Sequence, residues 1–511
     1  IQIDTWDDIN PCFGSGAFTV CSSTTGHITS LLTKNGDAKV AVNSKTHITY
    51  FLGEEVVGTE ELTHRLNVVV KDGELHVIRT YDERAAMLAL HEGDTLVVRG
   101  VVSSFPTLRY GRQTFELNTY VNGAPMVLRI RARSFTIDYG ESLLVRGPLT
   151  RVAGRLPGEA SVYLMSLGAA GEVRAVGSAE ELGGHGGNPI IRGFFWPLHD
   201  RIRQQLARGF GAASGLPLAL LLGERSALQT NVREAFKSLG ITHLLALSGF
   251  HLGLVVAAVL GFQRLLGRSS PTTLIVVLGA FVGTVGSIVS LTRALIMVVL
   301  MVAARLARRP MSGLNSLAGA YVLILLWRPY VIYGLSFQLS FVATFAVLHC
   351  VARMPSSDGR SRARRVAKMV SASLGISCAA QLFVAPIILE VFGQISLMSP
   401  VATLVCVPAV AVVLMGSALA AMLSLVHADA GIWACGLLDP LCRLFADTVV
   451  AVAAMCPQLL ELSPPNAGVY YAGLACAWVG RGGWWVRAIG VVVMIFSFAE
   501  PVDDVFGFLD F

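Results

Sequence analysis

The distribution of apolar and charged positions changes near residue 240. Before about residue 190, charged residues are frequent, and no apolar run reaches the roughly 18 residues that a membrane-spanning helix needs. From about residue 240 onward, long apolar runs follow one another to the C-terminus. This pattern predicts an α+β membrane protein, in which a β-rich part precedes a polytopic α-helical membrane domain over residues 243–500.

The apolar runs predict about nine or ten membrane spans. Residues 196–242 are predicted to form amphipathic interfacial helices, because Trp196, Leu198, Ile202 and Leu206 share one helical stripe. The expected spans are 243–263, 272–290, 292–307, 313–328, 332–352, 368–389, 396–426 with a bend or split at Pro408, 430–455, and one or two between 468 and 499.

Short strands are expected before residue 150. In residues 1–90, Val68–Val70 and Leu75–Ile78 flank Lys71-Asp72-Gly73, which is typical of a hairpin turn. An internal echo marks residues 91–150, where Gly93–Gly100 reads GDTLVVRG and Gly140–Gly147 reads GESLLVRG. This echo predicts two strands that are entered through the same type of turn.

The segments between the two echo strands are strand-like as well, namely Thr114–Val121 and Met126–Phe135. Several short strands with Gly-rich turns indicate a small extracytoplasmic barrel that is OB-like. The remaining predicted units are a Gly-rich connector over residues 151–195 and a short acidic tail over residues 501–511.

Composition supports a membrane protein and says little about partners. The chain is 53% hydrophobic and 14% charged, whereas soluble domains carry about 25% charged residues. The net charge of +6 is weak evidence for a nucleic-acid partner, because basic cytoplasmic loops of any membrane protein can supply it.

The basic residues predict the orientation of the chain in the membrane. Arginine clusters follow the first, third and fifth expected spans, and such loops are cytoplasmic by the positive-inside rule. The N-terminal domain is then expected outside the cytoplasm, where a disulfide between Cys12 and Cys21 could persist. Whether the two cysteines pair stays open, because a sequence does not show geometry. No signal peptide or span precedes the domain at Ile1, so we expect a fragment or a processed form.

Motifs for hydrolysis, metal binding and nucleotide binding are missing from the sequence. No His-x-His pair, HExxH, Cys-x-x-Cys or P-loop occurs. We therefore expect no enzymatic activity, no catalytic residue, no metal and no cofactor.

Polar residues within the expected spans are the first candidates for function, because they are costly in lipid and commonly face a cavity or a partner. Two glycines, Gly249 and Gly253, lie beside Ser248 and His251 and permit close backbone approach or a broken helix. The alternative is that each polar side chain only bonds a neighbouring helix. The candidate pore residues are His243, Ser248, Gly249, His251, Gly253, Arg293, Gln338 and Gln381.

The predicted barrel carries a second set of candidates. Arg129, Arg131 and Arg133 alternate with small or apolar residues, so on a strand they share one face at a spacing of roughly 6–7 Å. That spacing suits an extended phosphate backbone, and nearby aromatic rings could stack on bases. The alternative is a solvated sheet face above core aromatics. The candidate DNA-binding residues are Arg129, Arg131, Arg133, Arg99, Tyr110 and Phe115, with Tyr120 and Phe135 near them.

One long segment resembles a known family. Leu221–Val255 reads LLGERSALQTNVREAFKSLGITHLLALSGFHLGLV and is similar to the core signature of the ComEC competence family. That signature has a Gly-Asp/Glu-Arg-Ser segment and an amphipathic helix before a His-Leu-Leu-Ala-Ile-Ser-Gly-Leu-His-hydrophobic-Gly motif. The motif falls here on His243–Gly253, with Leu247 and Phe250 as conservative changes.

Further segments resemble the family in the same order, from about residue 93 to 426. Three positions depart from its pattern: Arg328 stands where Asp is usual, Thr403 where Asn is typical, and Leu156 replaces Asn. The last spans match only in hydrophobicity.

The resemblance implies a bacterial cytoplasmic-membrane channel that takes up single-stranded DNA during natural transformation. Its implied partners are the DNA strand, the lipid bilayer and other competence proteins, including a receptor, a nuclease and a motor. Many family members add a metallo-β-lactamase-like domain. The sequence up to Phe511 shows no such domain, so we expect the nuclease to be a separate protein. Two alternatives remain open: a permease for a smaller solute, and a membrane assembly protein that transports nothing.

Overall fold

The computed structural model describes most residues from 93 to 478. The gaps are 110–111, 122–123, 134–136, most of 153–168, 177–179, 268–269, 287, 354–361 and 457–458. Beyond them it describes residues 489, 491–494, 497 and 498, and before residue 93 only the backbone of strands. The Cys12–Cys21 pairing that the sequence left open falls outside the described side chains.

The described backbone of residues 1–90 is β-structure, as predicted. Strand β8 (Arg65–Lys71) pairs antiparallel with β9 (Glu74–Thr80), and Lys71 lies opposite Glu74, so the predicted hairpin is confirmed. The other strands are β1 (Gln2–Ile3), which pairs with β8, and the six-stranded meander β2 (Phe13–Ser15), β3 (Phe18–Ser22), β4 (Thr29–Thr33), β5 (Ala38–Val42), β6 (His47–Leu52) and β7 (Glu55–Glu61).

The next strands close a small barrel. Its order is β10-β12-β13-β15-β14, and β14 pairs back with β10, which gives the five strands of an OB-like barrel. Only β13 and β15 run parallel among these pairs. The bounds are β10 Thr95–Val102, β11 Thr107–Arg109, β12 Arg112–Val121, β13 Ala124–Arg133, β14 Glu141–Val152, β15 Gly171–Arg174 and β16 Glu180–His185.

The echoed sequences form the paired strands β10 and β14. Each strand follows a glycine with positive φ, Gly93 at 96° and Gly140 at 86°, so both are entered through the same left-handed turn, as predicted. The closing glycines of the echo have a second role. A Cβ on Gly100 would collide with the carbonyl oxygen of Asn118, and one on Gly147 with that of Arg174. The repeat thus encodes turns at one end and close strand approach at the other.

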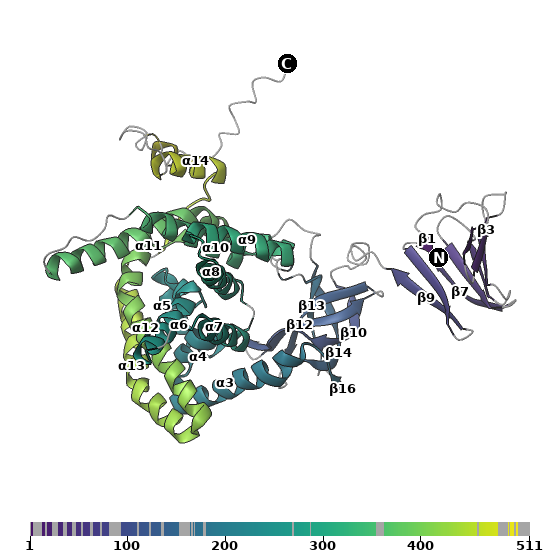
Figure 1. The fold of residues 1–511 in the computed structure, drawn as a ribbon, viewed down its shortest axis with the longest axis horizontal. Coiled ribbons are helices and arrows are strands. Elements are labelled where there is room, and N and C mark those ends of the chain that lie inside the picture. The colour runs from purple at the N-terminus through teal and green to yellow at the C-terminus, as the bar shows by residue number, and fades with distance from the viewer. Residues whose placement is uncertain are drawn as a thin grey trace, which may run out of the picture.

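The remaining described chain is mainly helical (Figure 1), and it also contains the antiparallel pair β17 (Gln394–Ile395) and β18 (Leu460–Glu461). In that view α11, α12, α13 and α3 border the central helices α4–α7. The bounds are α3 Trp196–Phe210, α4 Gly215–Leu222, α5 Thr230–Ser238, α6 Gly249–Leu265, α7 Pro271–Val285, α8 Val289–Leu306, α9 Gly313–Trp327, α10 Leu335–Val351, α11 Arg362–Phe392, α12 Ser399–Val426, α13 Ala428–Met455 and α14 Ala467–Trp478, with short 3-10 or π segments η2 Ile191–Phe195, η3 Gly211–Ala213, η4 Arg225–Ala227, η5 Thr242–Leu244 and η6 Pro329–Tyr333.

A helix occurs at each predicted span that the structure describes, but the helices differ in length. Within the described residues, three are long and apolar enough to cross a membrane, in α8, α11 and α12. Helices such as α7 and α9 have 15 residues and extend about 22 Å, less than the roughly 30 Å of a hydrocarbon core. The total of nine or ten spans stays a prediction. Helix α12 continues through Pro408 and is not split there.

Helix α3 differs from its prediction in what covers its apolar stripe. Its apolar stripe is buried within the protein, with Trp196 and Ile202 each 9% exposed and Leu206 1% exposed. The stripe packs against α12 and α13, and a Cβ on Gly209 would lie 2.6 Å from that of Cys435. An amphipathic stripe can be covered by lipid or by another helix, and the periodicity is the same for both. The stripe of α3 therefore faces other helices, and the position of α3 relative to the membrane surface stays a prediction.

Helix α14 satisfies a backbone carbonyl that a proline leaves open. Pro386 lies inside α11 and has no N–H, so the carbonyl of Leu382 loses its helical donor. The hydroxyl of Tyr470 donates to that carbonyl oxygen at 2.9 Å, and the hydroxyl of Tyr471 donates to the oxygen of Phe383 at 3.0 Å. Tyr470 is 2% exposed, so water does not replace it.

We predict that Tyr470→Phe lowers the free energy of unfolding by about 1–3 kcal/mol, because it leaves a buried carbonyl unsatisfied. In a Pro386→Ala background the loss should shrink, since the new N–H bonds the Leu382 oxygen. Tyr471→Phe is the matched control, because the Phe383 oxygen has residue 387 as its helical donor in both backgrounds. Denaturant titrations in mixed micelles measure the free energy of unfolding of each variant in both backgrounds. Equal losses on Tyr470→Phe in the Pro386 protein and in the Pro386→Ala background would contradict the prediction.

Candidate functional site

The motif segment, defined as residues 240–251, connects α5 to α6. Gly240 turns the chain with φ of 70°, the 3-10 helix η5 follows, and α6 begins only at Gly249. Leu244, Leu245 and Leu247 anchor the segment, each 5% exposed or less. The motif is therefore mostly a buried connection, whereas the sequence predicted that a span begins at residue 243.

Ser248 and His251 cap the start of α6. The backbone N–H of Ser248 donates to Nδ1 of His251 at 3.3 Å, and the Ser248 hydroxyl oxygen accepts from the backbone N–H of His251. This reciprocal arrangement is a capping box in which His takes the usual place of Glu or Gln. Because Nδ1 accepts, Nε2 carries the ring proton. His251 is fully buried, and Nε2 has no hydrogen-bond partner among the described residues. The spacing S-x-x-H was the signal for a cap.

Arg293 of α8 lies against the first residue of α6. Its Nη1 donates to the carbonyl oxygen of Ser340 in α10, and its guanidinium carbon is 5.7 Å from the centre of the Phe341 ring. A Cβ on Gly249 would be 2.9 Å from Nη2 of Arg293, so glycine makes room for the guanidinium. Three helices therefore meet at this point. Gly253 differs, since it is exposed and a Cβ there would meet nothing within 4 Å.

The other side of the motif segment contacts α12 and the loop before it, and that loop is in turn bonded to α11. The Ser399 hydroxyl donates to the Gly240 oxygen at 3.0 Å, and Nε2 of Gln381 donates to the Ser396 oxygen at 2.7 Å. His243 and Thr403 face each other, with Nε2 3.5 Å from Oγ1. These contacts hold the segment between two helix pairs.

The structure thus gathers most predicted pore residues around one segment. Gln338 is not among them, because its side-chain amide donates to the oxygen of Ile332 in the turn before its own helix, at 3.1 Å. The gathered residues are His243, Ser248, Gly249, His251, Arg293 and, through Ser396, Gln381. Their role in transport stays a prediction.

On the barrel, Arg129 and Arg131 project from the same side of β13, and a glutamate sits beside them. Nε of Arg131 is 2.9 Å from a Glu172 carboxylate oxygen, and Nε of Arg129 is 3.9 Å from the other oxygen. Arg129 is 8% exposed and Glu172 3%, whereas the Arg131 side chain is 38% exposed. The basic face is therefore partly neutralised by an acid that lies about forty residues later in the chain. The Arg133 side chain lies outside the described ones.

The predicted stacking residues differ in how far they are exposed. Phe115 is 1% exposed within the barrel core, so the prediction that it stacks on bases is wrong. The strand alternation that turns Glu116 outward turns Phe115 inward. Tyr120 is 72% exposed on the same strand, Arg99 is exposed on β10, and Tyr110 lies outside the described residues.

An aromatic cluster joins the barrel to the helices. Phe105, in the loop after β10, has its ring centre 5.1 Å from those of both Trp196 and His199. His199 is 4% exposed, with Nδ1 2.8 Å from the Thr284 oxygen and Nε2 3.3 Å from a carboxylate oxygen of Glu224. The barrel thus contacts α3 through Phe105, and His199 of α3 links this contact to the end of α7 and to Glu224 of the Gly-Glu-Arg-Ser segment.

A second contact between the barrel region and the helices involves Arg328, which stands where the family usually has Asp. Its Nη2 donates to the oxygen of Leu167 at 3.2 Å, which links the end of α9 to the loop before β15. Burial raises the pKa of Glu116 on the barrel, while the positive charges of Arg328 and Arg129 lower it. An arginine at position 328 therefore faces a glutamate across the junction.

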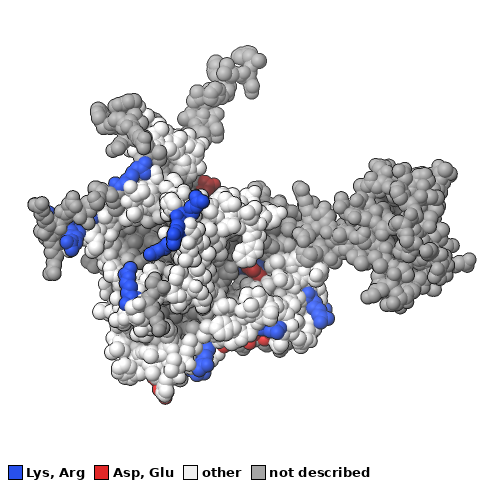
Figure 2. Space-filling model, in the orientation of Figure 1, with Lys and Arg blue, Asp and Glu red and all other residues white. Residues whose placement is uncertain are grey.

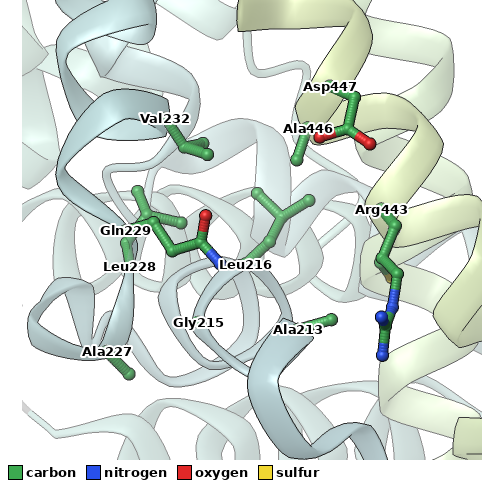
Figure 3. Close-up of a pocket in the computed structure, with 11 residues that line it drawn as sticks. Ala213, Gly215, Leu216, Ala227, Leu228, Gln229, Val232, Arg443, Ala446 and Asp447 are labelled. Atoms are coloured by element: carbon green, nitrogen blue, oxygen red, sulfur yellow. The ribbon is translucent and has the colours of Figure 1, made fainter.

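A pocket of about 240 Å³ separates α13 from the α4–α5 region (Figure 3). Gln229, Cys442, Arg443 and Asp447 contribute to its lining. Arg443 is paired with Asp439, Nε to Oδ2 2.7 Å. Within the described residues no group of three or more His, Cys, Asp or Glu could hold a metal ion.

We predict that Phe105→Ala loosens the barrel–helix junction. Loss of the ring contacts should raise hydrogen–deuterium exchange several-fold in residues 103–109 and in the first turn of α3, because an aromatic pair contributes about 0.5–1.5 kcal/mol beyond its burial. Tyr120→Ala, which removes an exposed ring, should leave both regions unchanged. Faster exchange throughout β12 and β13 would instead mean that the barrel itself depends on Phe105, against this prediction.

The match to a known protein family includes the same motif segment. A family model described as Competence protein matches residues 220–487, just over half of the chain, which include the motif segment, Arg293, Ser340 and Gln381. ComE operon protein 3 of Bacillus subtilis (strain 168) is 30% identical over 203 residues, which are 38% of this chain and 24% of that protein. The chain thus spans about a quarter of that relative's length in the match. No solved structure matches the chain. The protein therefore belongs to the competence protein family, the ComEC family that its HLLALSGFHLG motif resembles.

Proposed function

We propose that this protein is a membrane channel for the uptake of single-stranded DNA during natural transformation. The observation that carries the proposal is the family match over the motif segment, a stretch of capped, hydrogen-bonded backbone held between α8 and α10 on one side and α11 and α12 on the other. Non-helical backbone at membrane depth is tolerated where it is buried in protein or lines a cavity. A channel can accommodate such an interruption of its apolar helices where the segment lines the path.

The proposed setting is the bacterial cytoplasmic membrane, crossed about nine or ten times, with the barrel outside the cytoplasm. Supporting it are the three helices long and apolar enough to span and the shorter apolar helices between them. On the face drawn in Figure 2, charged side chains are sparse over the helical part. Arg305, Arg308 and Arg309 cluster at the end of α8, as a cytoplasmic end requires.

In this proposal the barrel guides the strand before it enters the membrane. Phosphate contacts dominate affinity without reading sequence, and among the candidate arginines with described side chains Arg131 and Arg99 are the accessible ones. Tyr120 replaces Phe115 as the ring able to stack on a base. Glu172 fixes the direction of the Arg131 guanidinium and keeps the local charge low, which favours loose binding that a moving strand can leave.

The motif segment, Arg293 and Gln381 would then shape the path through the helices. A receptor, a nuclease and a motor would be separate competence proteins, and no catalytic step is assigned to this chain. A solute permease or an assembly protein would not need DNA affinity in the barrel. Transport of labelled single-stranded DNA is therefore the discriminating measurement.

We predict opposite outcomes for two neighbouring glycines. Gly249→Leu pushes into the Arg293 guanidinium and should reduce transformation at least tenfold, whereas Gly253→Leu enters open space and should be tolerated. Transformation frequency is compared at matched amounts of inserted protein, determined by immunoblot of membranes. Equal transformation frequencies for the two variants would mean that the motif segment does not shape the transport path.

We predict that two barrel variants change DNA affinity in opposite directions. Arg131→Gln should weaken binding of single-stranded DNA and lower the slope of log affinity against log salt by roughly 0.7, the value for one phosphate contact. Glu172→Gln should strengthen binding, because it removes the competing carboxylate. Arg201→Gln, at an exposed arginine on α3, makes the same charge change outside the barrel and is the control. Fluorescence anisotropy with the full chain in nanodiscs measures the DNA affinity of all three variants. Equal effects of the two arginine variants would mean that the β13 arginine face is only a solvated surface.

A further inference from the structure

Arg293 is a buried cation without an opposite charge. It is 5% exposed, and among the described residues no carboxylate lies within salt-bridge distance of it. Its contacts are one carbonyl oxygen and one aromatic ring, and its Nε has no hydrogen-bond partner in the described part of the chain. Burying a charge in this way is costly, and in membrane helices it commonly marks a ligand path.

The position of the guanidinium makes the missing charge more evident. It lies against Gly249, the first residue of the 17-residue helix α6. The first N–H groups of a helix have no intrahelical acceptor, and this end carries a partial positive charge. A cation at a helix N-terminus is repelled unless an anion lies between them. Two positive sources therefore converge where no anion of the described chain is placed.

His251 adds a third donor on the same turn. Its Nδ1 accepts from Ser248, which leaves the Nε2 proton on a fully buried ring with no partner among the described residues. The site therefore offers a guanidinium and the first two amides of α6, which a helix leaves without an intrahelical acceptor, with an imidazole N–H on the same turn. Its acceptors, the Ser340 carbonyl oxygen and the Ser248 hydroxyl, are neutral, so no negative charge of the described residues competes with a ligand.

We propose that Arg293 and the first turn of α6 form an oxyanion-binding site that holds one phosphate group, with His251 as a further donor. Helix N-termini bind phosphate through their amides, and arginine binds it through two parallel hydrogen bonds. In the channel this phosphate is a phosphodiester of the DNA strand, a step that rests on the proposed function. One such contact midway recognises the backbone whatever the base sequence.

The competing explanation is that Arg293 only ties α8 to α10 through the Ser340 oxygen. The two explanations predict opposite effects on stability. A purely structural arginine stabilises the fold, so its removal lowers the thermal midpoint. An arginine kept for a ligand is buried at a cost, so Arg293→Met should leave the midpoint unchanged or raise it.

The experiment uses the full chain in lipid nanodiscs, with inorganic phosphate as the first probe and chloride at equal ionic strength as its control. Phosphate should raise the thermal midpoint of the unmodified protein by roughly 2–4 °C at about ten times its dissociation constant. Arg293→Met should abolish this rise, and Arg293→Lys should keep part of it, because lysine offers charge without the fork. Arg443→Met is the matched control, since Arg443 lies in an apolar helix but already has Asp439.

A single-stranded oligothymidylate and the DNA uptake assay form the second arm. If phosphate stabilises through Arg293 but no DNA is bound or taken up, the site stands, its ligand is free phosphate, and the proposed function fails. If DNA is taken up while Arg293→Met lowers the midpoint and responds to phosphate like the unmodified chain, the arginine is structural and the site is overturned.

Discussion

Every polar backbone group inside an apolar bundle needs a hydrogen-bond partner, and the helical half of this protein depends on that requirement. The helix α6 starts within the bundle, so Ser248 and His251 cap it reciprocally. The chain turns at Gly240, and Ser399 bonds the exposed carbonyl. Pro386 removes a donor from α11, and Tyr470 supplies another from α14. These irregular points hold together because side chains far away in sequence complete them.

The same requirement explains why the family motif is buried. A short non-helical segment cannot satisfy its own backbone, so α11 and α12 close over one side and α8 and α10 over the other. The resulting polar seam lies in the interior of an otherwise apolar domain. A polyanion that crosses the domain would meet the unpaired donors of Arg293 and His251 at this seam.

The junction between barrel and helices connects the two candidate sites. His199 has oxygen atoms at both ring nitrogens, one from the end of α7 and one from Glu224 in the family signature, and its ring packs on Phe105 of the barrel. Arg328 makes a second contact and faces the acidic Glu116. The signature residue Glu224 therefore joins the barrel junction to the chain segment that leads into α6.

Local patterns were sufficient for the elements, and tertiary partners decided their roles. Alternation and the glycine echo predicted β10, β12, β13 and β14, and apolar runs predicted the helices, because backbone conformation follows from nearby residues. The sequence did not show that α12 and α13 cover the stripe of α3, that Phe115 points into the core, or that Glu172 pairs with Arg131. Periodicity specifies which residues share a face but not what covers that face, because the covering residues lie far along the chain. For the same reason HLLALSGFHLG identified the family from sequence alone, whereas only the packing of α8 against Gly249 revealed an arginine without an anion.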